Sequence, residues 1–349
     1  MIRYGSERSM GKALIVELSV VLTVLACGNS GAVYVTSGGT DEIIVLDAAT
    51  GTERTRIAVD PRPFDIDEPH GIASTPSHLF VTVSHGEPTL WKFELPDARL
   101  VGRLRLQTAG AGRIGITPDL SRAFIPDYYR DGPGDASQVA VVDLHDLSIL
   151  STITACAAPH DAQVDPTGEI VAITCSQSDE IVLVDADRMV ERQRFPVGPS
   201  PGAAGQPRYR PLNVVWSPDG DQLYVTLHAT GELARFKRDG SYEGALAVGA
   251  GPAQLAQTPG GQRLVIANRL SRSATLVRTP TFTVDTTIDL DRPHPHGVTV
   301  NADGSLAFIT YEGDIDTPGG VVALDMQTDS IRWSAEAGSY TLGVIYVTR

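Results

Sequence analysis

The chain has 349 residues, a hydrophobic content of 42% and a formal net charge of −14. This hydrophobic content is enough for a packed core, and large closed β-structures of this length occur as single domains. The negative charge excludes nucleic acid as a partner, because a protein that neutralises phosphates needs a basic face. It also argues against docking on anionic lipid, so a membrane would be reached only through a lipid anchor.

The N-terminal segment has the pattern of an export signal. After a basic start, residues 13–26 form an apolar run that ends at Cys27. A run this short is typical of a signal peptide rather than a membrane span. The sequence VLAC that ends at Cys27 resembles a bacterial lipobox, so residues 1–27 are expected to be a signal peptide with Cys27 as its lipidation site. Ordinary cleavage nearby and a true start at Met10 are the alternatives, and each leaves an exported protein of the periplasm or cell surface.

Residues 28–349 are expected to form one domain built from a repeat. Between two short apolar strands a turn recurs, usually with Pro, at residues 76, 118, 166, 218, 259 and 302. A third strand follows, beginning near residues 42, 89, 138, 180, 232, 273 and 320, and then a fourth. A spacing of 41 to 52 residues between turns, with four strands per unit, is the signature of a β-propeller. The sequence therefore predicts an all-β, seven-bladed propeller of four-stranded antiparallel blades.

The first blade begins one strand late. Residues 32–39 match a second strand, whereas residues 341–349 match a first strand, with Leu342-Gly343-Val344 aligned on His296-Gly297-Val298. We therefore expect the C-terminal strand to complete the N-terminal blade. This would close the ring and leave no free sheet edge to pair with other chains.

The repeats resemble those of the YVTN family of β-propeller proteins. The matching segments are Leu223–Thr226, Val33–Thr36, Arg263–Asn268 and third strands that end in Val-Asp, such as Val184-Asp185. The resemblance covers nearly all of the mature chain and implies the propeller fold. Proteins of this architecture include surface-layer proteins, periplasmic metal-binding propellers, the nitrous oxide reductase propeller, haem d1 domains and lactonases, so the resemblance selects no single function.

Histidines collect at one expected mouth of the channel. Counting six residues back from each turn reaches the start of a first strand, and counting nine or ten forward reaches the end of a second strand. Both ends lie at the same mouth of a propeller. Five of the eight histidines fall on such positions, namely His70, His85, His160, His228 and His296.

These positions suggest a transition-metal site. Neutral imidazole and thiolate suit copper or zinc, and the candidate ligands are His70, His85, His160, Cys175, His228, His296 and Asp127. The preferred trio is His160, Cys175 and His228. Two alternatives remain open: a disulfide between Cys156 and Cys175 would remove the thiolate, and the histidines could be structural, bonding neighbouring loops.

The sequence thus favours an exported binding propeller that takes copper, zinc or a partner protein at this mouth. The alternative is an enzyme that uses the same mouth, either a lactonase-like hydrolase acting through Asp127, His228 and Arg113 or a metal-dependent redox protein. The chain has no C-x-x-C-H motif, so covalent c-type haem is not expected. The segment 198–211 is the longest insertion between blades and is expected to lie over the mouth.

Overall fold

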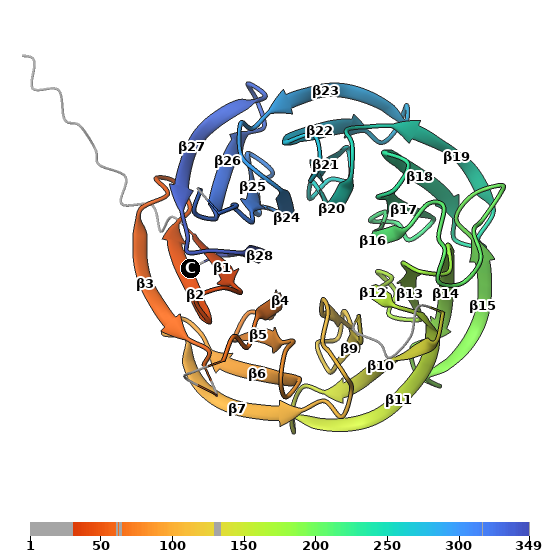
Figure 1. Ribbon diagram of the computed structural model, residues 1–349, viewed down its shortest axis with the longest axis horizontal. Coiled ribbons are helices and arrows are strands. Elements are labelled where there is room, and N and C mark those ends of the chain that lie inside the picture. The colour runs from red at the N-terminus through yellow and green to blue at the C-terminus, as the bar shows by residue number, and fades with distance from the viewer. Residues whose placement is uncertain (1–30, 61, 63–64, 129–133, 316, 349) are drawn as a thin grey trace, which may run out of the picture.

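The structure is a computed structural model that describes residues 31–60, 62, 65–128, 134–315 and 317–348. Its strands form seven antiparallel four-stranded sheets set as blades around a ring (Figure 1). The predicted seven-bladed propeller is therefore confirmed. The expected signal peptide, residues 1–27, and its Cys27 lie outside the described residues. Within the described part of the chain, no helix is long and apolar enough to cross a membrane.

Each blade runs outward from the channel in four strands. The innermost strands are β28 (Thr341–Val347), β4 (Pro69–Ser74), β8 (Gly115–Ile116), β12 (Pro159–Val164), β16 (Pro211–Trp216), β20 (Pro252–Gln257) and β24 (Pro295–Val300). The second strands are β1 (Ala32–Ser37), β5 (His78–Val83), β9 (Arg122–Pro126), β13 (Ile170–Cys175), β17 (Gln222–Leu227), β21 (Arg263–Asn268) and β25 (Leu306–Tyr311). The third strands are β2 (Glu42–Asp47), β6 (Thr89–Glu94), β10 (Ala136–Asp143), β14 (Glu180–Asp185), β18 (Glu232–Lys237), β22 (Ser273–Arg278) and β26 (Gly320–Asp325). The outermost strands are β3 (Glu53–Ala58), β7 (Arg99–Arg105), β11 (Ser148–Ala157), β15 (Val190–Pro196), β19 (Tyr242–Ala247), β23 (Thr283–Asp289) and β27 (Ser330–Glu336).

The ring closes as the sequence predicts. The C-terminal strand β28 pairs antiparallel with β1 in the order β28-β1-β2-β3, with Val33 opposite Tyr346 and Val35 opposite Val344. Leu342 is buried in this position. The innermost edge of the first blade is therefore supplied by the last strand of the chain.

The core lies between neighbouring blades. One apolar cluster joins Ile181 and Leu183 of β14 to Leu223 and Val225 of β17 in the next blade. The three inner strands are mostly buried, whereas an outermost strand such as β3 alternates between exposed and half-buried residues. Blade packing therefore explains why the inner strands are nearly continuous apolar runs rich in β-branched residues.

A buried threonine links each of five blades to the next. The five are Thr36, Thr82, Thr174, Thr226 and Thr310. The Thr226 hydroxyl accepts the Asn213 N–H at 3.0 Å and donates to the Ala253 carbonyl of the next blade at 2.8 Å. All five residues are the threonine of a Val-Thr or Ile-Thr pair on a second strand, and the same geometry recurs in each. The repeated threonine thus holds the innermost strands at a fixed spacing around the channel.

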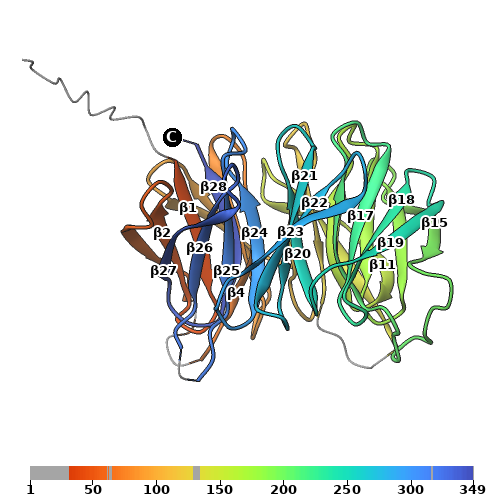
Figure 2. The same ribbon diagram turned by 90° about the horizontal axis from the view of Figure 1, so that it is seen from above.

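The two faces of the ring differ. Ala32 at the start of β1 pairs with Val347 at the end of β28, so both chain ends of the propeller lie at one face. Figure 2 shows the C-terminal end at the upper face, whereas the innermost strands β4 and β24 begin at the lower face. The residues that begin these innermost strands surround the opening described next.

Candidate functional site

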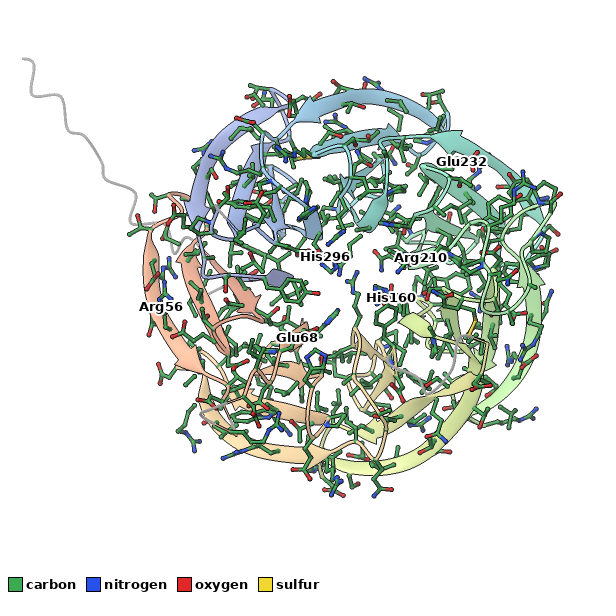
Figure 3. All side chains as sticks on the ribbon, viewed as in Figure 1. Arg56, Glu68, His160, Arg210, Glu232 and His296 are labelled. Carbon is green, nitrogen blue, oxygen red and sulfur yellow. A yellow bond between two sulfur atoms is a disulfide. The ribbon has the colours of Figure 1, made fainter. Side chains whose placement is uncertain are left out.

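A polar cavity of about 210 Å³ occupies the mouth at this lower face. Its lining residues come from all seven blades: Glu68, His70, Tyr128, His160, Arg210, Leu212, His228, Ala253, Arg269, His296, Glu312, Tyr340 and Leu342. Figure 3 shows Glu68, His160, Arg210 and His296 around the central opening of the ring. Six of the residues occupy the first-strand position that the sequence count marks, from His70 to Leu342. The sequence register therefore locates this cavity.

Three buried histidines converge in the cavity. The ring of His70 lies 6.5 Å from that of His160 and 6.1 Å from that of His296, measured between centroids. Each of the three side chains comes from the second residue of an innermost strand, β4, β12 or β24. They therefore belong to different blades and are brought together only by the closed ring.

Two of these imidazoles are neutral at pH 7. Burial and the nearby His70 lower the pKa of His160 well below its usual value, and burial lowers the pKa of His296 to about 4. The Nδ1 of His160 lies 2.9 Å from the Leu212 carbonyl oxygen, and that of His296 lies 3.4 Å from the Leu342 carbonyl oxygen. Since a carbonyl only accepts, Nδ1 carries the proton in His160. The Nε2 of His160 is then a hydrogen-bond acceptor. The Nδ1 of His296 also lies 3.5 Å from the side-chain nitrogen of Gln254.

Glu68 joins two histidines of the second blade. Its carboxylate lies 3.2 Å from Nδ1 of His70 and 2.9 Å from Nδ1 of His85. His85 is half exposed and is not among the described residues that line the cavity. His85 therefore supports the wall of the site from outside.

Arg269 and Glu312 form a paired charge in the wall. Two hydrogen bonds of 2.7 and 2.6 Å connect the guanidinium to the carboxylate in a fork. Burial alone would raise the pKa of Glu312, but the Arg269 hydrogen bonds together with the charge interactions of Arg269 and the nearby histidines lower that pKa overall. The positive charge of Arg269 and the negative charge of Glu312 therefore neutralise each other.

Arg210 is held in the wall by the insertion that precedes β16. The buried Asp179 carboxylate accepts four backbone N–H groups of this insertion, those of Gly202, Arg208, Tyr209 and Arg210. The insertion, residues 198–211, thus places Arg210 in the wall of the cavity. This agrees with the position over the mouth that the sequence predicts for the insertion. Arg210 itself adopts φ = 55°, a left-handed conformation that is uncommon for a residue with a side chain.

Two polar atoms in this part of the wall are buried without a hydrogen-bond partner. They are Nε of Arg210 and Nδ1 of His228. The two residues are neighbours, since the His228 N–H donates to the Arg210 carbonyl at 3.1 Å. Burial, followed by the Arg210 charge, lowers the pKa of His228. Because nearly all buried polar groups in proteins are bonded, this pair marks where a ligand group would fit.

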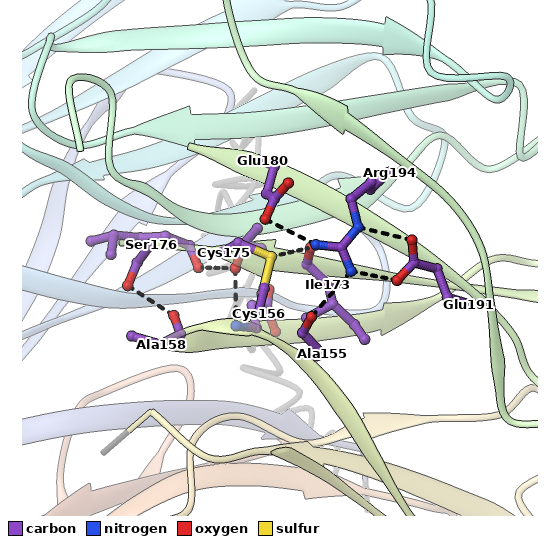
Figure 4. The surroundings of a disulfide bond; sticks show 12 residues. Ala155, Cys156, Ala158, Ile173, Cys175, Ser176, Glu180, Glu191 and Arg194 are labelled. Atoms are coloured by element: carbon purple, nitrogen blue, oxygen red, sulfur yellow. Dashed lines mark hydrogen bonds and ion pairs between the residues drawn. A yellow bond between two sulfur atoms is a disulfide. The ribbon is translucent and has the colours of Figure 1, made fainter. Parts of the chain in front are cut away.

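Cys175 is not a metal ligand in this structure. It forms a disulfide with Cys156, with a Cα–Cα distance of 5.7 Å, and both residues are buried. The bond ties β11 of the third blade to β13 of the fourth, and Figure 4 shows it beside the Arg194 guanidinium, which bonds Glu180 and Glu191. The thiolate of the preferred trio His160, Cys175 and His228 is therefore lost, and the disulfide alternative is correct.

The other candidate ligands are only partly assembled. His70, His160, His228 and His296 line the cavity, while Asp127 accepts the Ala109 N–H at 2.9 Å. No group of three or more His, Cys, Asp or Glu side chains among the described residues is placed to hold a metal ion. For the hydrolase alternative, Arg113 lies 3.8 Å from Asp161 and, like Asp127, is absent from the described lining.

The sequence count misplaces several second-strand positions. In the structure, the mouth-facing residue at the end of a second strand donates its N–H to a backbone carbonyl. That carbonyl belongs to the residue two places before the first-strand position, as in His228 to Arg210 and Glu312 to His294. By this criterion the mouth residues are Gly38, Ser84, Ser176, His228, Arg269 and Glu312. Cys175 therefore lies one residue too early and His85 one too late, and successive residues of a strand point to opposite faces.

Sequence counting also missed Glu68, Arg210 and Tyr340. Each stands two residues before a first-strand position and has a φ between 52 and 55°. The same register, extended by two residues, would have found them. Burial raises the pKa of Tyr340 to about 12, so its hydroxyl is protonated at pH 7 and available as a donor.

No protein-family model and no curated protein matches the chain. Solved structures are similar to it in fold. A functionally unknown protein from Desulfotomaculum acetoxidans has a TM-score of 0.72 at 15% identity, with 91% of this chain and 99% of that chain covered. Hydrazine synthase from Kuenenia stuttgartiensis has a TM-score of 0.68 at 16% identity, covering 80% of this chain and 95% of that chain. A candidate 6-phosphogluconolactonase from Bacteroides fragilis has a TM-score of 0.71 at 13% identity, covering 92% of this chain and 99% of that chain. At these identities the likeness bears on the fold alone.

Proposed function

We propose that this protein is an exported binding propeller that takes a small polar ligand in its mouth cavity. The observation that carries the proposal is the pair of buried atoms without partners, Arg210 Nε and His228 Nδ1, in a concave and polar site. Buried groups of this kind cost free energy unless a ligand or water satisfies them. The volume of about 210 Å³ suits a ligand smaller than a typical drug.

Export and anchoring are part of the proposal. They rest on the basic start, the short apolar run and the lipobox-like Cys27 of the sequence. The propeller begins at Ala32, at the face opposite to the cavity. A lipid on Cys27 would therefore leave the cavity facing away from the membrane, open to ligands or to a partner protein.

Binding is favoured over hydrolysis by the set of residues in the cavity. Of the three residues considered for a lactonase-like reaction, His228 alone is among the described lining. The likeness to a candidate 6-phosphogluconolactonase is too distant to bring that activity to this chain. The cavity walls supply hydrogen-bonding groups that are already fixed by protein partners, as a binding site requires.

Copper or zinc is the second candidate ligand. The observation in its favour is that His160 bonds the Leu212 carbonyl through Nδ1, which leaves Nε2 as a potential ligand atom. Metal-binding histidines are commonly fixed in this way by a partner on the other ring nitrogen. A metal would require the rings of His70, His160 and His296 to move closer together than they lie here.

The proposal is tested by calorimetric titration of the full chain, purified in mild detergent, with a library of small neutral and charged compounds and with copper and zinc salts. We expect saturable binding of a small compound, weakened by His228→Leu but not by His145→Leu, the matched control. His145 is almost fully exposed and outside the cavity. Stoichiometric metal that EDTA removes with a loss of thermal stability would favour the metal instead. Absence of any saturable binding would remove the proposed function.

A further inference from the structure

Arg210 carries a positive charge that no carboxylate of the described cavity lining neutralises. Glu312 is paired with Arg269, and the Glu68 carboxylate contacts His70 and His85. The guanidinium of Arg210 donates to the hydroxyl of Tyr128 at 3.3 Å, and no ion pair joins it to a carboxylate of the described residues. Asp179 binds only its backbone N–H, at 2.8 Å. The guanidinium of Arg210 therefore lies at the cavity without a carboxylate partner.

The cavity also offers an acceptor close to Arg210. The Nε2 atom of His160 carries a lone pair, because Nδ1 is the protonated nitrogen of that ring. His160 lies on β12, and Arg210 precedes β16 of the next blade. A ligand that satisfies both residues needs an anionic group for Arg210 and a hydroxyl donor for His160.

We propose that the ligand is a small hydroxycarboxylate whose carboxylate binds Arg210. This inference rests on the proposed binding function and names the class of its ligand. A planar guanidinium with an unused Nε–H matches the two oxygens of a carboxylate, and such charge-assisted pairs are the stronger hydrogen bonds of proteins. The hydroxyl of the ligand donates to Nε2 of His160. A free metal cation, in contrast, would be repelled by the positive charge of Arg210.

The position of Arg210 supports a built site rather than a chance surface charge. Its backbone is fixed by Asp179, and its Nε is buried. The adjacent Arg208, on the same insertion, is exposed, stacks over the Tyr209 ring and does not line the cavity.

The test is calorimetric titration of the full chain with a library of small hydroxycarboxylates, each paired with its neutral amide and its deoxy acid. We expect the amide of the best ligand to bind at least tenfold more weakly, and Arg210→Gln to weaken binding of the acid by tenfold to a hundredfold. Arg208→Gln should leave the affinity unchanged. The deoxy acid should also bind more weakly, since it lacks the hydroxyl donor.

Three results would overturn the inference. They are equal affinity for acid and amide, no effect of Arg210→Gln on the affinity, and a preference for inorganic phosphate over every carboxylate. If neutral compounds bind and Arg210→Gln has no effect, the hydroxycarboxylate is wrong while the proposed binding function stands. If no compound of either kind binds, both fall. Circular dichroism and urea unfolding of each variant establish that the fold is intact.

Discussion

Removing the hydroxyl of Thr226 should cost a large share of the stability of the propeller. Thr226→Val keeps the shape of the side chain but leaves the Asn213 N–H and the Ala253 carbonyl without a partner, both in a fully buried position. A buried group left unbonded costs about 1–3 kcal/mol. The two together predict a loss of about 2–6 kcal/mol in the free energy of unfolding, against totals of about 5–15 kcal/mol for natural domains.

The assay is urea denaturation followed by fluorescence, with Thr226→Ser as the matched control. Serine keeps the hydroxyl and both hydrogen bonds but loses one buried methyl, which costs about 1 kcal/mol. The valine variant should therefore be less stable than the serine variant. If valine is as stable as serine, the methyl and not the hydrogen bonds holds the blades, and the threonine bridge contributes packing alone.

Three further predictions concern closure, the disulfide and pH. Deleting residues 341–349 should abolish cooperative thermal unfolding, because β1 loses its innermost neighbour β28. A truncated chain that melts like the intact one would disprove the closure. Replacing Cys156 and Cys175 by serine should lower stability by about 3 kcal/mol for a loop of this length, measured by urea unfolding with and without reductant; an unchanged midpoint would contradict this. Burial lowers the pKa of His296 to about 4, so as the pH falls the unfolded chain binds this proton before the folded chain does. The free energy of unfolding should be full above pH 6.5 and fall towards pH 4. His296→Gln should flatten the stability profile between these two pH values.

The fold could be predicted from the sequence because the repeat contains its own register. The turn residues and the strands around them recur in every blade, so the count of blades and the closing strand follow from alignment alone. The first-strand positions are correct for the same reason, since six residues separate His160 from Pro166 and His296 from Ala302. Local hairpin geometry was enough to locate the cavity.

The second-strand positions could not be predicted in this way because the hairpin turns differ in length. Thr82 follows Pro76 by six residues, whereas Thr226 follows Pro218 by eight. The mouth residue follows the turn residue by eight positions in the second blade, Pro76 to Ser84, and by ten in the fourth, Pro166 to Ser176. A count of nine therefore falls one residue late at His85 and one residue early at Cys175, and a shift of one residue moves a side chain to the other face of the strand. Aligning on the bridging threonine instead would have replaced Cys175 and His85 by Ser176 and Ser84 and would have selected Glu312.

The pairing of charges across the cavity was beyond the sequence for a different reason. Arg269 and Glu312 lie on adjacent blades, and Arg210 reaches the cavity through an insertion whose path depends on the buried Asp179. Nothing in the local pattern of these residues marks them as partners. Only the closed ring, which sets the distance between blades, decides which charges neutralise one another.

The histidines of the cavity have a structural task as well as the proposed binding task. Blades three and six carry Pro126 and Ala267 where the other blades have the bridging threonine. The carbonyls that such threonines would meet belong to His160 and His296. The imidazoles of these two histidines reinforce the bridges that follow, and the Leu212 carbonyl accepts from both His160 and Thr174 at 2.9 Å. A histidine used only as a brace would be replaceable by another Nδ-donor such as asparagine without loss of affinity. A histidine that also offers Nε2 to a ligand cannot be replaced by asparagine without a loss of affinity. His160→Asn should therefore lower the affinity for the ligand more than it lowers the free energy of unfolding.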